Sequence, residues 1–388
     1  MINGKTLILR FSSMGDVAMT VPVIRCLEKK YPKNKFIYVT RPKFKPLFEE
    51  FENVEIFELD LKKRHKGFFG LFRLFSDLKK LKPKRIADLH SVLRTNILSF
   101  LFKIFLKKVS VIDKKRKERK ALIRKENKIF KPLTPVHFLY QEVFNKLGFS
   151  IDLTKDHIFP AAKTIDLIVS PEVLYRDPEQ AEEWKKERQY KIDLLSKNKK
   201  KIGIAPFAKH EAKMYPLDLM QKIVSYIQHN HYVFLFGFGK LEMETIHRWS
   251  NVFPNVYTAE SYHNYANLYS VYPLEPGGFF NKDDFQDFRY EIAQISNLDL
   301  MISMDSANGH IAANYNVPVI TLWGLTHPYT GFSTFNSDPK NQFCVDREKF
   351  PLVPNSIYGN KMIKGYENGM RTISIEEVLG RVNEILLD

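Results

Sequence analysis

The sequence predicts an α/β protein built from two doubly wound, Rossmann-like halves. First, short apolar runs alternate with segments of helical periodicity, which is typical of parallel sheets covered by helices. Second, this alternation occurs twice along the chain, and 388 residues are enough for two separate cores. Third, no low-complexity linker divides the halves, so we expect them to share a cleft.

The N-terminal half opens the alternation. We expect strands at residues 6–11, 36–40, 54–59 and 85–89, and helices at 17–30, 68–81 and 92–106. Residues 97–106 are apolar on nearly every side, and a helix of that kind is usually buried. The alternative is an interfacial helix lying on a membrane beside the basic segment that follows, and burial is the favoured interpretation.

The C-terminal half repeats the alternation after a transition. We expect strands at residues 202–206, 233–236, 256–257, 298–302 and 319–322, and helices at 217–229, 241–249, 285–295 and 310–315. The transition predicts a strand at 165–169 and a charged, helix-prone segment at 171–201. An irregular tail at 336–368 precedes a last helix at 375–386, which Ser374 caps.

These elements divide the chain into four expected parts. They are an N-terminal domain at 1–160, a connecting segment at 161–200, a C-terminal domain at 201–345, and a tail with a terminal helix at 346–388. We expect the terminal part to pack back on the N-terminal domain.

The net charge of +16 is concentrated in two segments of the N-terminal half. Residues 62–85 contain ten Lys or Arg against one acid, and residues 107–128 contain eleven against three. Such segments indicate an anionic partner: a phosphorylated acceptor, an acidic membrane surface or nucleic acid. Two solvated helical faces are the plainer alternative. A protein that binds nucleic acid or another polyanion through these segments is the alternative to an enzyme.

Composition favours a globular protein of a reducing compartment. The hydrophobic content is 44%, and two cysteines, Cys26 and Cys344, are too few for a disulfide framework. We recognise no signal peptide, and the longest apolar stretch is too short to span a bilayer. We therefore expect a cytoplasmic protein, and no cysteine pattern suggests a metal site.

Polar loops follow predicted strands in both halves. Asp16, in the loop 12–16, could accept a proton from a hydroxyl nucleophile, although an acid at this place is also an ordinary helix cap. Lys209 and Lys213, in the loop 206–216, could bind phosphate, or could be exposed lysines without a function.

Two further loops belong to the C-terminal half. Gly237-Phe-Gly239 lets a ligand approach the backbone, and Glu242 could bind ribose hydroxyls or simply favour a helix start. Asp305 ends a predicted strand, and Ser306 can cap the helix after it. Open parallel sheets bind ligands at this edge, and a helix N-terminus suits phosphate. A cap followed by a structural His310 is the plainer alternative.

Four motifs resemble those of one known family. Arg10-Phe-Ser-Ser-Met-Gly-Asp16, followed by Thr20-Val-Pro22, resembles the N-terminal signature of the ADP-heptose:lipopolysaccharide heptosyltransferases, glycosyltransferase family 9. Ala87-Asp88-Leu-His90, with Arg94-Thr95, is similar to their second strand-end motif, and Lys213-Met-Tyr-Pro216 to their Lys-Arg-Trp-Pro element. Asp305-Ser-Ala-Asn-Gly-His310 resembles their Asp-Thr-Gly-x-x-His signature, with Ala307 and Ser306 in place of the usual glycine and threonine.

The resemblance implies a GT-B fold, in which two Rossmann-like domains face each other across a cleft. It implies an inverting, metal-independent glycosyltransferase that moves a heptose-like sugar from a nucleotide diphosphate donor, ADP-heptose, to an acidic lipopolysaccharide core or related glycolipid. It implies no cofactor beyond the nucleotide-sugar substrate and no nucleic acid partner. Such an acceptor would bring the enzyme into peripheral contact with the cytoplasmic face of the inner membrane.

The resemblance also implies a role for each matched residue. Asp16 would be the general base, Lys213 would bind the donor diphosphate and Glu242 would contact the ribose. Asp305 would hold the donor sugar. The donor would also be bound by Ser306, Ala307, Asn308 and His310, and the acceptor by Ser12, Ser13, His90 and Arg94. A nucleotide-sugar epimerase or hydrolase on the same fold remains an alternative, and it would consume donor without an acceptor.

Overall fold

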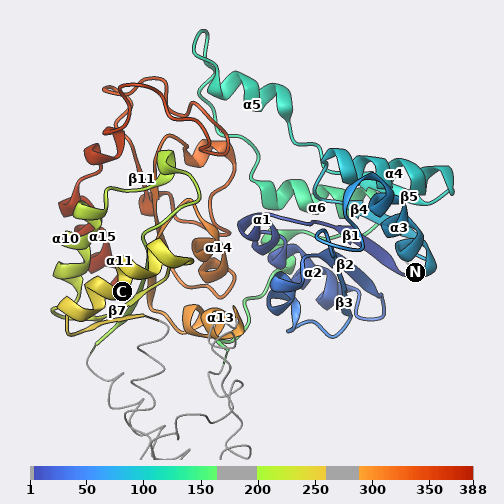
Figure 1. Ribbon diagram of the computed structural model, residues 1–388, viewed down its shortest axis with the longest axis horizontal. Coiled ribbons are helices and arrows are strands. Elements are labelled where there is room, and N and C mark those ends of the chain that lie inside the picture. The colour runs from blue at the N-terminus through green and yellow to red at the C-terminus, as the bar shows by residue number, and fades with distance from the viewer. Residues whose placement is uncertain (1–3, 164–198, 259–287, 388) are drawn as a thin grey trace, which may run out of the picture. The chain divides into compact units, whose positions relative to one another are not determined.

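The computed structural model of the protein describes residues 4–163, 199–258 and 288–387 (Figure 1). The chain forms two compact units. Unit 1 contains Met1–Pro160 and Pro328–Phe335, and unit 2 contains Ala161–His327 and Asn336–Asp388. The predicted strand at 165–169, most of the segment at 171–201 and the start of the helix at 285–295 lie outside the described residues.

Unit 1 is built on a parallel sheet whose strands, within the described residues, run in the order β3-β2-β1-β4-β5. The strands are β1 (Thr6–Leu9), β2 (Phe36–Thr40), β3 (Val54–Glu58), β4 (Arg85–Asp88) and β5 (Lys108–Val111). The helices are α1 (Met14–Ala18), α2 (Val21–Lys30), α3 (Gly67–Lys80), α4 (Leu93–Ile104), α5 (Arg116–Ile123), α6 (Val136–Lys146) and α7 (Leu153–Asp156), with the 3-10 helix η1 (Pro42–Phe48). The four strands predicted in this half are confirmed, and β5 was missed because four residues next to lysines give no clear pattern.

Burial explains why these segments form a sheet. Every residue of β1 and β2 is buried, as expected for central strands of a parallel sheet covered on both faces. α3 and α4 cover one face, where Leu74 and Leu98 belong to the same core cluster as Leu7 and Ile37. Because all strand pairs are parallel, their carboxyl ends lie at one edge of the sheet.

The predicted helix at 17–30 is wrong in one respect, because the chain forms two helices there. α1 ends at Ala18, and α2 begins at Val21 with Thr20 as its N-cap. Pro22 has no N–H to donate to the carbonyl of Ala18, and its ring is tolerated only in the first turn of a helix. The break leaves Asp16 in a short helix of its own, directly after β1.

The expectation that residues 97–106 are buried is wrong on one side of α4. Leu98 and Phe102 are buried, but Phe100 is 63% exposed and Leu106 is exposed as well. The helix therefore has one apolar face in the core and a second apolar face in solvent. Among the helices that the structure describes, none is long and apolar enough to cross a membrane.

Unit 2 contains, within its described residues, a parallel sheet in the order β11-β10-β9-β6-β7-β8. The strands are β6 (Lys201–Ala205), β7 (Tyr232–Leu235), β8 (Val256–Thr258), β9 (Leu300–Met304), β10 (Val319–Trp323) and β11 (Gln342–Cys344). The helices are α10 (Leu217–Ile227), α11 (Lys240–Val252), α13 (Phe288–Ser296), α14 (Ala307–Ala313) and α15 (Ile375–Leu387). The predicted strands and helices are confirmed, although α14 begins at Ala307 because Ser306 is its N-cap.

The C-terminal tail differs from its prediction in three ways. β11 pairs with β10 inside the stretch 336–368, which was expected to be irregular. Val378 and Val382 of α15 belong to the core of unit 2, so the expectation that this helix packs on the N-terminal domain is wrong. The segment 328–335 belongs to unit 1, although it lies within the range 201–345 expected to form the C-terminal domain.

The segment 328–335 is attached to unit 1 by backbone and ring contacts. The N–H of Leu133 donates to the carbonyl of Tyr329 over 2.9 Å. The ring of Phe335 packs edge-on against His157, with 4.6 Å between the ring centroids. The segment thus completes unit 1, although unit 2 supplies the residues before and after it.

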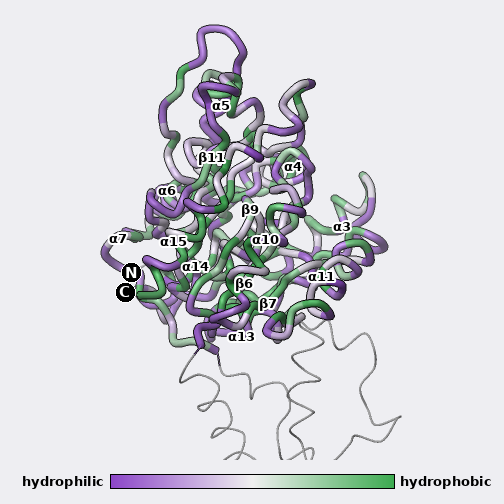
Figure 2. The backbone as a smooth tube through the Cα atoms, turned by 90° about the vertical axis from the view of Figure 1, so that its left-hand side faces the viewer, coloured by the Kyte–Doolittle hydropathy of each residue, from purple (hydrophilic) through white to green (hydrophobic). Residues whose placement is uncertain are grey.

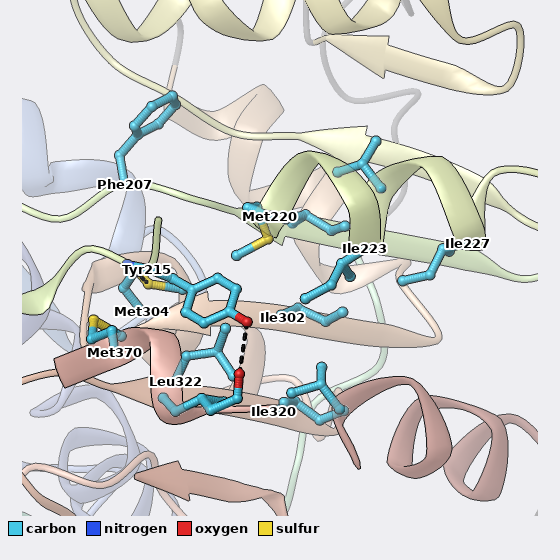
Figure 3. Packing of buried hydrophobic residues seen from close by; sticks show 14 of the residues in the cluster. Phe207, Tyr215, Met220, Ile223, Ile227, Ile302, Met304, Ile320, Leu322 and Met370 are labelled. Atoms are coloured by element: carbon cyan, nitrogen blue, oxygen red, sulfur yellow. Dashed lines mark hydrogen bonds between the residues drawn. The ribbon is translucent and has the colours of Figure 1, made fainter. Parts of the chain in front are cut away.

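Tyr215 connects three parts of the core of unit 2 (Figure 3). Its ring is fully buried among side chains of α10, β9 and β10. Its hydroxyl donates to the carbonyl of Ile373 over 2.9 Å, and its backbone nitrogen lies 3.2 Å from the sulfur of Met304. Because Lys213 is two residues earlier, these contacts also fix the loop that carries this lysine.

We expect Tyr215→Phe to lower the free energy of unfolding by about 1–3 kcal/mol, because the carbonyl of Ile373 stays buried and loses its donor. Urea unfolding measures the change. Tyr226→Phe is the matched control, since Tyr226 lies on α10 and is 52% exposed; its effect should stay within about 0.5 kcal/mol. Equal stability of Tyr215→Phe and the wild type would contradict the prediction.

Candidate active site

In unit 1 an ion pair joins Arg10 and Asp16 at the carboxyl edge of the sheet. Nη2 of Arg10 lies 2.6 Å from Oδ1 of Asp16, and the two side chains are 7% and 20% exposed. Ser13 donates to Oδ2 of the same carboxylate, from its hydroxyl over 2.7 Å and from its backbone N–H over 3.2 Å. Asp16 is therefore the third residue of α1 and forms a capping box with Ser13, which is the N-cap, so the plainer interpretation of Asp16 as the N-cap itself is wrong. Its carboxylate is partly exposed, and Ser12 and Ser13 precede it.

The carboxyl group of Asp16 is ionised at neutral pH. Burial alone would raise its pKa, but the guanidinium of Arg10 and the hydrogen bonds from Ser13 outweigh burial, so the pKa is lowered. Because this pKa is lower in the folded chain, ionised Asp16 stabilises unit 1 above its unfolded pKa of about 4. That stabilisation is lost as the pH falls through the lowered, folded-state pKa.

Arg10 also connects the loop after β1 to the turn after β4. Its Nη1 donates to the carbonyl of Leu89 over 2.9 Å. The buried carboxylate of Asp88 accepts from the N–H groups of His90 and Ser91, which fixes the turn. Burial, followed by the positive charge of Arg10, lowers the pKa of His90 to about 3. His90 is therefore an uncharged ring at this edge of the sheet.

Lys114, after β5, is a further cation at this edge, and the sequence did not single it out. Its Nζ lies 3.3 Å from the carbonyl of Ser91. Burial and the positive charge of Arg10 lower the pKa of Lys114 to about 8, so an anion at this place would favour its charged form. Arg94, expected to bind an acceptor, donates from Nη1 to the carbonyl of His65 over 2.7 Å, and its contact with an acceptor stays a prediction.

In unit 2 the corresponding edge carries a second ion pair. Lys213 ends the 3-10 helix η3 (Glu211–Lys213) after β6, and Asp305 follows β9. Nζ of Lys213 lies 2.7 Å from Oδ2 of Asp305, and both side chains are nearly buried. The hydroxyl of Thr326, after β10, donates to the same oxygen over 3.3 Å. Three loops that follow adjacent strands thus meet at one carboxylate.

Two glycines make room for Lys213 and its turn. A Cβ on Gly324 would collide with the carbonyl of Ala212 and lie 2.9 Å from Cα of Lys213. A Cβ on Gly359 would collide with Cγ and Cδ of Lys213, and the φ of Gly359 is +68°. The aliphatic part of Lys213 therefore lies against the backbone of Gly359, in the tail that was expected to be irregular.

The loop after β9 makes its own hydrogen bonds. The hydroxyl of Ser306 lies 2.9 Å from the hydroxyl of Ser303. The side-chain amide of Asn308 donates to Oε1 of Glu291, on α13, over 2.9 Å. Burial raises the pKa of Glu291 to about 7, although the bond from Asn308 opposes the shift. Glu291 was not predicted, since it lies on a helix before the motif.

Three other predicted donor residues are placed as follows. Ala307 is the first residue of α14, so a ligand there would meet its backbone N–H. His310 is buried within the same helix, as the plainer interpretation predicts. Glu242 accepts a hydrogen bond from the N–H of Phe238 over 2.8 Å, which closes the loop before α11. Its contact with a ribose stays a prediction.

The structure brings some of the predicted residues together, in one cluster in each unit. The cluster in unit 1 contains Ser13, Asp16 and His90, with Arg10 and Lys114 as additions. The cluster in unit 2 contains Lys213 and Asp305, with Thr326 and Gly359 as additions. Within residues 4–163, 199–258 and 288–387, no group of three or more His, Cys, Asp or Glu side chains could hold a metal ion.

Known proteins are similar to this chain in sequence and in fold. Residues 287–351 match glycosyltransferase family 9 (heptosyltransferase). The lipopolysaccharide core heptosyltransferase OpsX of Haemophilus influenzae is 22% identical over 390 residues, which cover 97% of this chain and 96% of that protein. Among solved structures, a family 9 glycosyltransferase from Veillonella parvula has a TM-score of 0.65 at 18% identity, covering 99% of this chain and 97% of its own. The E. coli heptosyltransferase WaaC with ADP has a TM-score of 0.59 at 14% identity, covering 98% and 99%.

The likeness to these solved structures shows that the two parallel α/β units have the GT-B fold. The family match and the relative of similar length indicate that the protein is a glycosyltransferase. Within the class, the family match and the relative of similar length confirm the resemblance to glycosyltransferase family 9 that the four motifs indicate. The matched range 287–351 includes Asp305 and Thr326, two of the three side chains that meet in unit 2.

We expect Gly359→Ala to destabilise unit 2 more than Gly365→Ala. Both glycines have a positive φ, +68° and +87°, so an alanine at either position costs about 1–2 kcal/mol of backbone strain. Only Gly359 lies against another residue, since nothing is within 4 Å of a Cβ on Gly365. Overpacking against Lys213 should add about 1–3 kcal/mol. Thermal and urea unfolding test the difference, and equal losses would contradict it.

Proposed function

We propose that the protein is an inverting heptosyltransferase that moves a heptose-like sugar from an ADP-linked donor to an acidic lipopolysaccharide core or related glycolipid. The pair between Lys213 and Asp305 carries the proposal, because it fixes a lysine cation at the strand edge where nucleotide donors bind in open α/β sheets. Two relatives support the sugar, the nucleotide and the acceptor: one is a lipopolysaccharide core heptosyltransferase, and another was solved with ADP.

Lys213 is the group proposed to bind the donor diphosphate. Its ammonium is held in place by Asp305 over 2.7 Å, and its aliphatic part is held against Gly359. Charge-assisted hydrogen bonds to phosphate oxygens strengthen as the sugar leaves and negative charge grows on the diphosphate. We assign Asp305 to the donor sugar, Glu242 to the ribose, and the backbone at Ser306, Ala307 and Asn308 to phosphate; His310 supports this loop from within α14.

Asp16 is the proposed general base. In an inverting transfer the acceptor oxygen attacks the anomeric carbon from the side opposite the diphosphate, and its proton passes to a base. The lowered pKa of Asp16 keeps the carboxylate ionised and ready to accept that proton. Arg10 stabilises the ionised form, and Lys114 supplies a positive charge for an acidic acceptor. We assign Ser12, Ser13, His90 and Arg94 to the acceptor; the bond from Nη1 of Arg94 to the carbonyl of His65 uses one of the five N–H donors of this guanidinium.

We propose that the reaction needs neither a metal ion nor a cofactor. Lys213 supports this, since it can supply the positive charge that a divalent ion supplies to a leaving diphosphate. We also propose that the enzyme works in the cytoplasm, in peripheral contact with the inner membrane, where a glycolipid acceptor would be located. The positive segments 62–85 and 107–128 support an anionic partner of this kind.

Lys213→Met should weaken the binding of ADP about 10- to 150-fold, because a charged hydrogen bond contributes about 1.5–3 kcal/mol. Methionine keeps an unbranched side chain against Gly359 but removes the charge and its ion pair with Asp305. Isothermal calorimetry measures the dissociation constant. Lys209→Met is the matched control from the same loop: Lys209 is exposed and should change affinity little. Normal affinity in Lys213→Met, or the larger loss in Lys209→Met, would refute the assignment.

Asp16→Asn should lower transfer of heptose from ADP-heptose by roughly 10²–10⁴-fold, the usual range for a general base, and leave ADP affinity unchanged. The assay contains EDTA and a delipidated core acceptor, and mass spectrometry with proton NMR identifies the product and its anomer. Donor consumption without an acceptor would favour the epimerase or hydrolase instead. A dependence on added divalent metal would refute the metal-independent mechanism.

A stability control separates catalysis from folding. Asp16→Asn leaves the guanidinium of Arg10 without its counter-ion, so unit 1 also loses stability. Glu50→Gln breaks a comparable pair in the same unit: Arg25 and Glu50 are 2.8 Å apart, with side chains 10% and 17% exposed. The two variants should lose similar stability, and only Asp16→Asn should lose turnover. Equal loss of turnover in both would mean that the role of Asp16 is structural.

A further inference from the structure

The outer face of α4 carries a continuous apolar stripe. Leu93, Ile97, Phe100 and Ile104 follow one another at intervals of four, three and four residues, so they lie on one side of the helix. Leu93 is 79% exposed, Phe100 63% and Ile104 59%, and Ile97 is partly buried. The opposite side of the helix contributes Leu98 and Phe102 to the core, and of the stripe only Ile97 packs against that core.

α3 carries exposed aromatic rings of its own and contacts the end of α4. Phe68, Phe72 and Phe75 have the spacing of one helix flank, and the ring of Phe75 contacts those of Phe102 and Phe105 at the end of α4. That flank therefore faces α4. Phe68 is 66% exposed and Phe72 44%, and their rings contact each other. Figure 2 shows hydrophobic stretches interrupted by hydrophilic ones along α3 and α4.

These exposed side chains are concentrated rather than scattered. Eight of the seventeen large apolar side chains exposed among the described residues fall within residues 68–106. They are Phe68, Phe69, Phe72, Leu93, Phe100, Ile104, Phe105 and Leu106. Scattered exposed apolar residues are normal, whereas a contiguous group indicates an interaction surface. We call residues 62–108 the α3–α4 surface.

The charge of the α3–α4 surface is strongly positive. Residues 62–108 contain fourteen Lys or Arg and two acids, a net charge of +12. Asp88 is buried, and Asp77 is paired with Arg64 over 2.8 Å and with Lys80 over 3.7 Å, so the two acids offset only a small part of the positive charge. Nζ of Lys79 lies 3.7 Å from the ring centroid of Phe105, which shows how closely cations and aromatic rings are mixed.

We propose that the α3–α4 surface docks on an anionic phospholipid bilayer, with the apolar stripe in the boundary between head groups and acyl chains. Lysines of a half-inserted surface contact lipid phosphates, while aromatic and aliphatic side chains enter the boundary. A second copy of the chain fits this surface poorly, since it would bring two charges of +12 together. A nucleic acid would neutralise the lysines but leave the aliphatic stripe of α4 uncovered. The proposal rests on the membrane contact in the function proposed above, and assigns it to particular helices.

Vesicle co-sedimentation tests the surface directly. The probes are vesicles of phosphatidylcholine with one quarter phosphatidylglycerol, and vesicles of phosphatidylcholine alone. We expect the full-length protein to bind the anionic vesicles more tightly, and the triple variant Leu93→Ser, Phe100→Ser and Ile104→Ser to bind them at least about tenfold more weakly. The matched control is Tyr226→Ser with Val252→Ser, which removes exposed apolar side chains from unit 2 and should bind normally.

Two further measurements decide between the possible outcomes. Thermal unfolding and ADP affinity of the triple variant should match the wild type, because the three side chains are exposed on unit 1. Its transfer to a delipidated acceptor should also be unchanged, while transfer to acceptor embedded in anionic vesicles falls. Vesicle binding without any transferase activity would support the surface and refute the proposed function. The proposal would be overturned if the wild type did not bind anionic vesicles, or if the triple variant bound them equally well. It would also be overturned if the wild type self-associated in solution and the triple variant did not.

Discussion

The ion pair between Lys213 and Asp305 is the interaction on which the arrangement of unit 2 most depends. It joins the loops after β6 and β9, and Thr326 brings in the loop after β10. Two charges that leave water in this way are stable only when their geometry is good and further hydrogen bonds satisfy them. Thr326 provides such a bond. A bound diphosphate would compete with Asp305 for the ammonium of Lys213. The strength of this ion pair would therefore reduce the affinity of the site for a diphosphate.

In unit 1 an arginine, Arg10, joins the loops that follow the strands. A guanidinium has five N–H donors in a fixed plane, so Arg10 can serve two acceptors at once: the carboxylate of Asp16 and the carbonyl of Leu89. A lysine could not hold both in one orientation. The same arginine lowers the pKa of Asp16, which keeps the carboxylate ionised but makes it a weaker base.

Most strands and the polar loops after them could be predicted from the sequence. Buried parallel strands are short apolar runs, and polar residues follow them. It was insufficient where a partner comes from a distant part of the chain. Gly359 meets Lys213 from a tail without periodicity, and Lys114 follows a strand too short to recognise. The sequence also showed that α4 is apolar on nearly every side, but not that one of its apolar faces is exposed to solvent. The helix predicted at 17–30 divided because the missing N–H of Pro22 outweighs a continuous apolar pattern.

The short segment 328–335 limits how this protein can be dissected. Its aromatic rings pack on unit 1, while residues on both sides of it belong to unit 2. A chain cut after residue 160 would leave the ring sites beside His157 empty in one fragment and expose Phe335 in the other. A chimera that takes its N-terminal half from a relative would likewise need the segment of that relative that corresponds to residues 328–335. In this chain, the boundary between the two units consists of three cuts, after residues 160, 327 and 335.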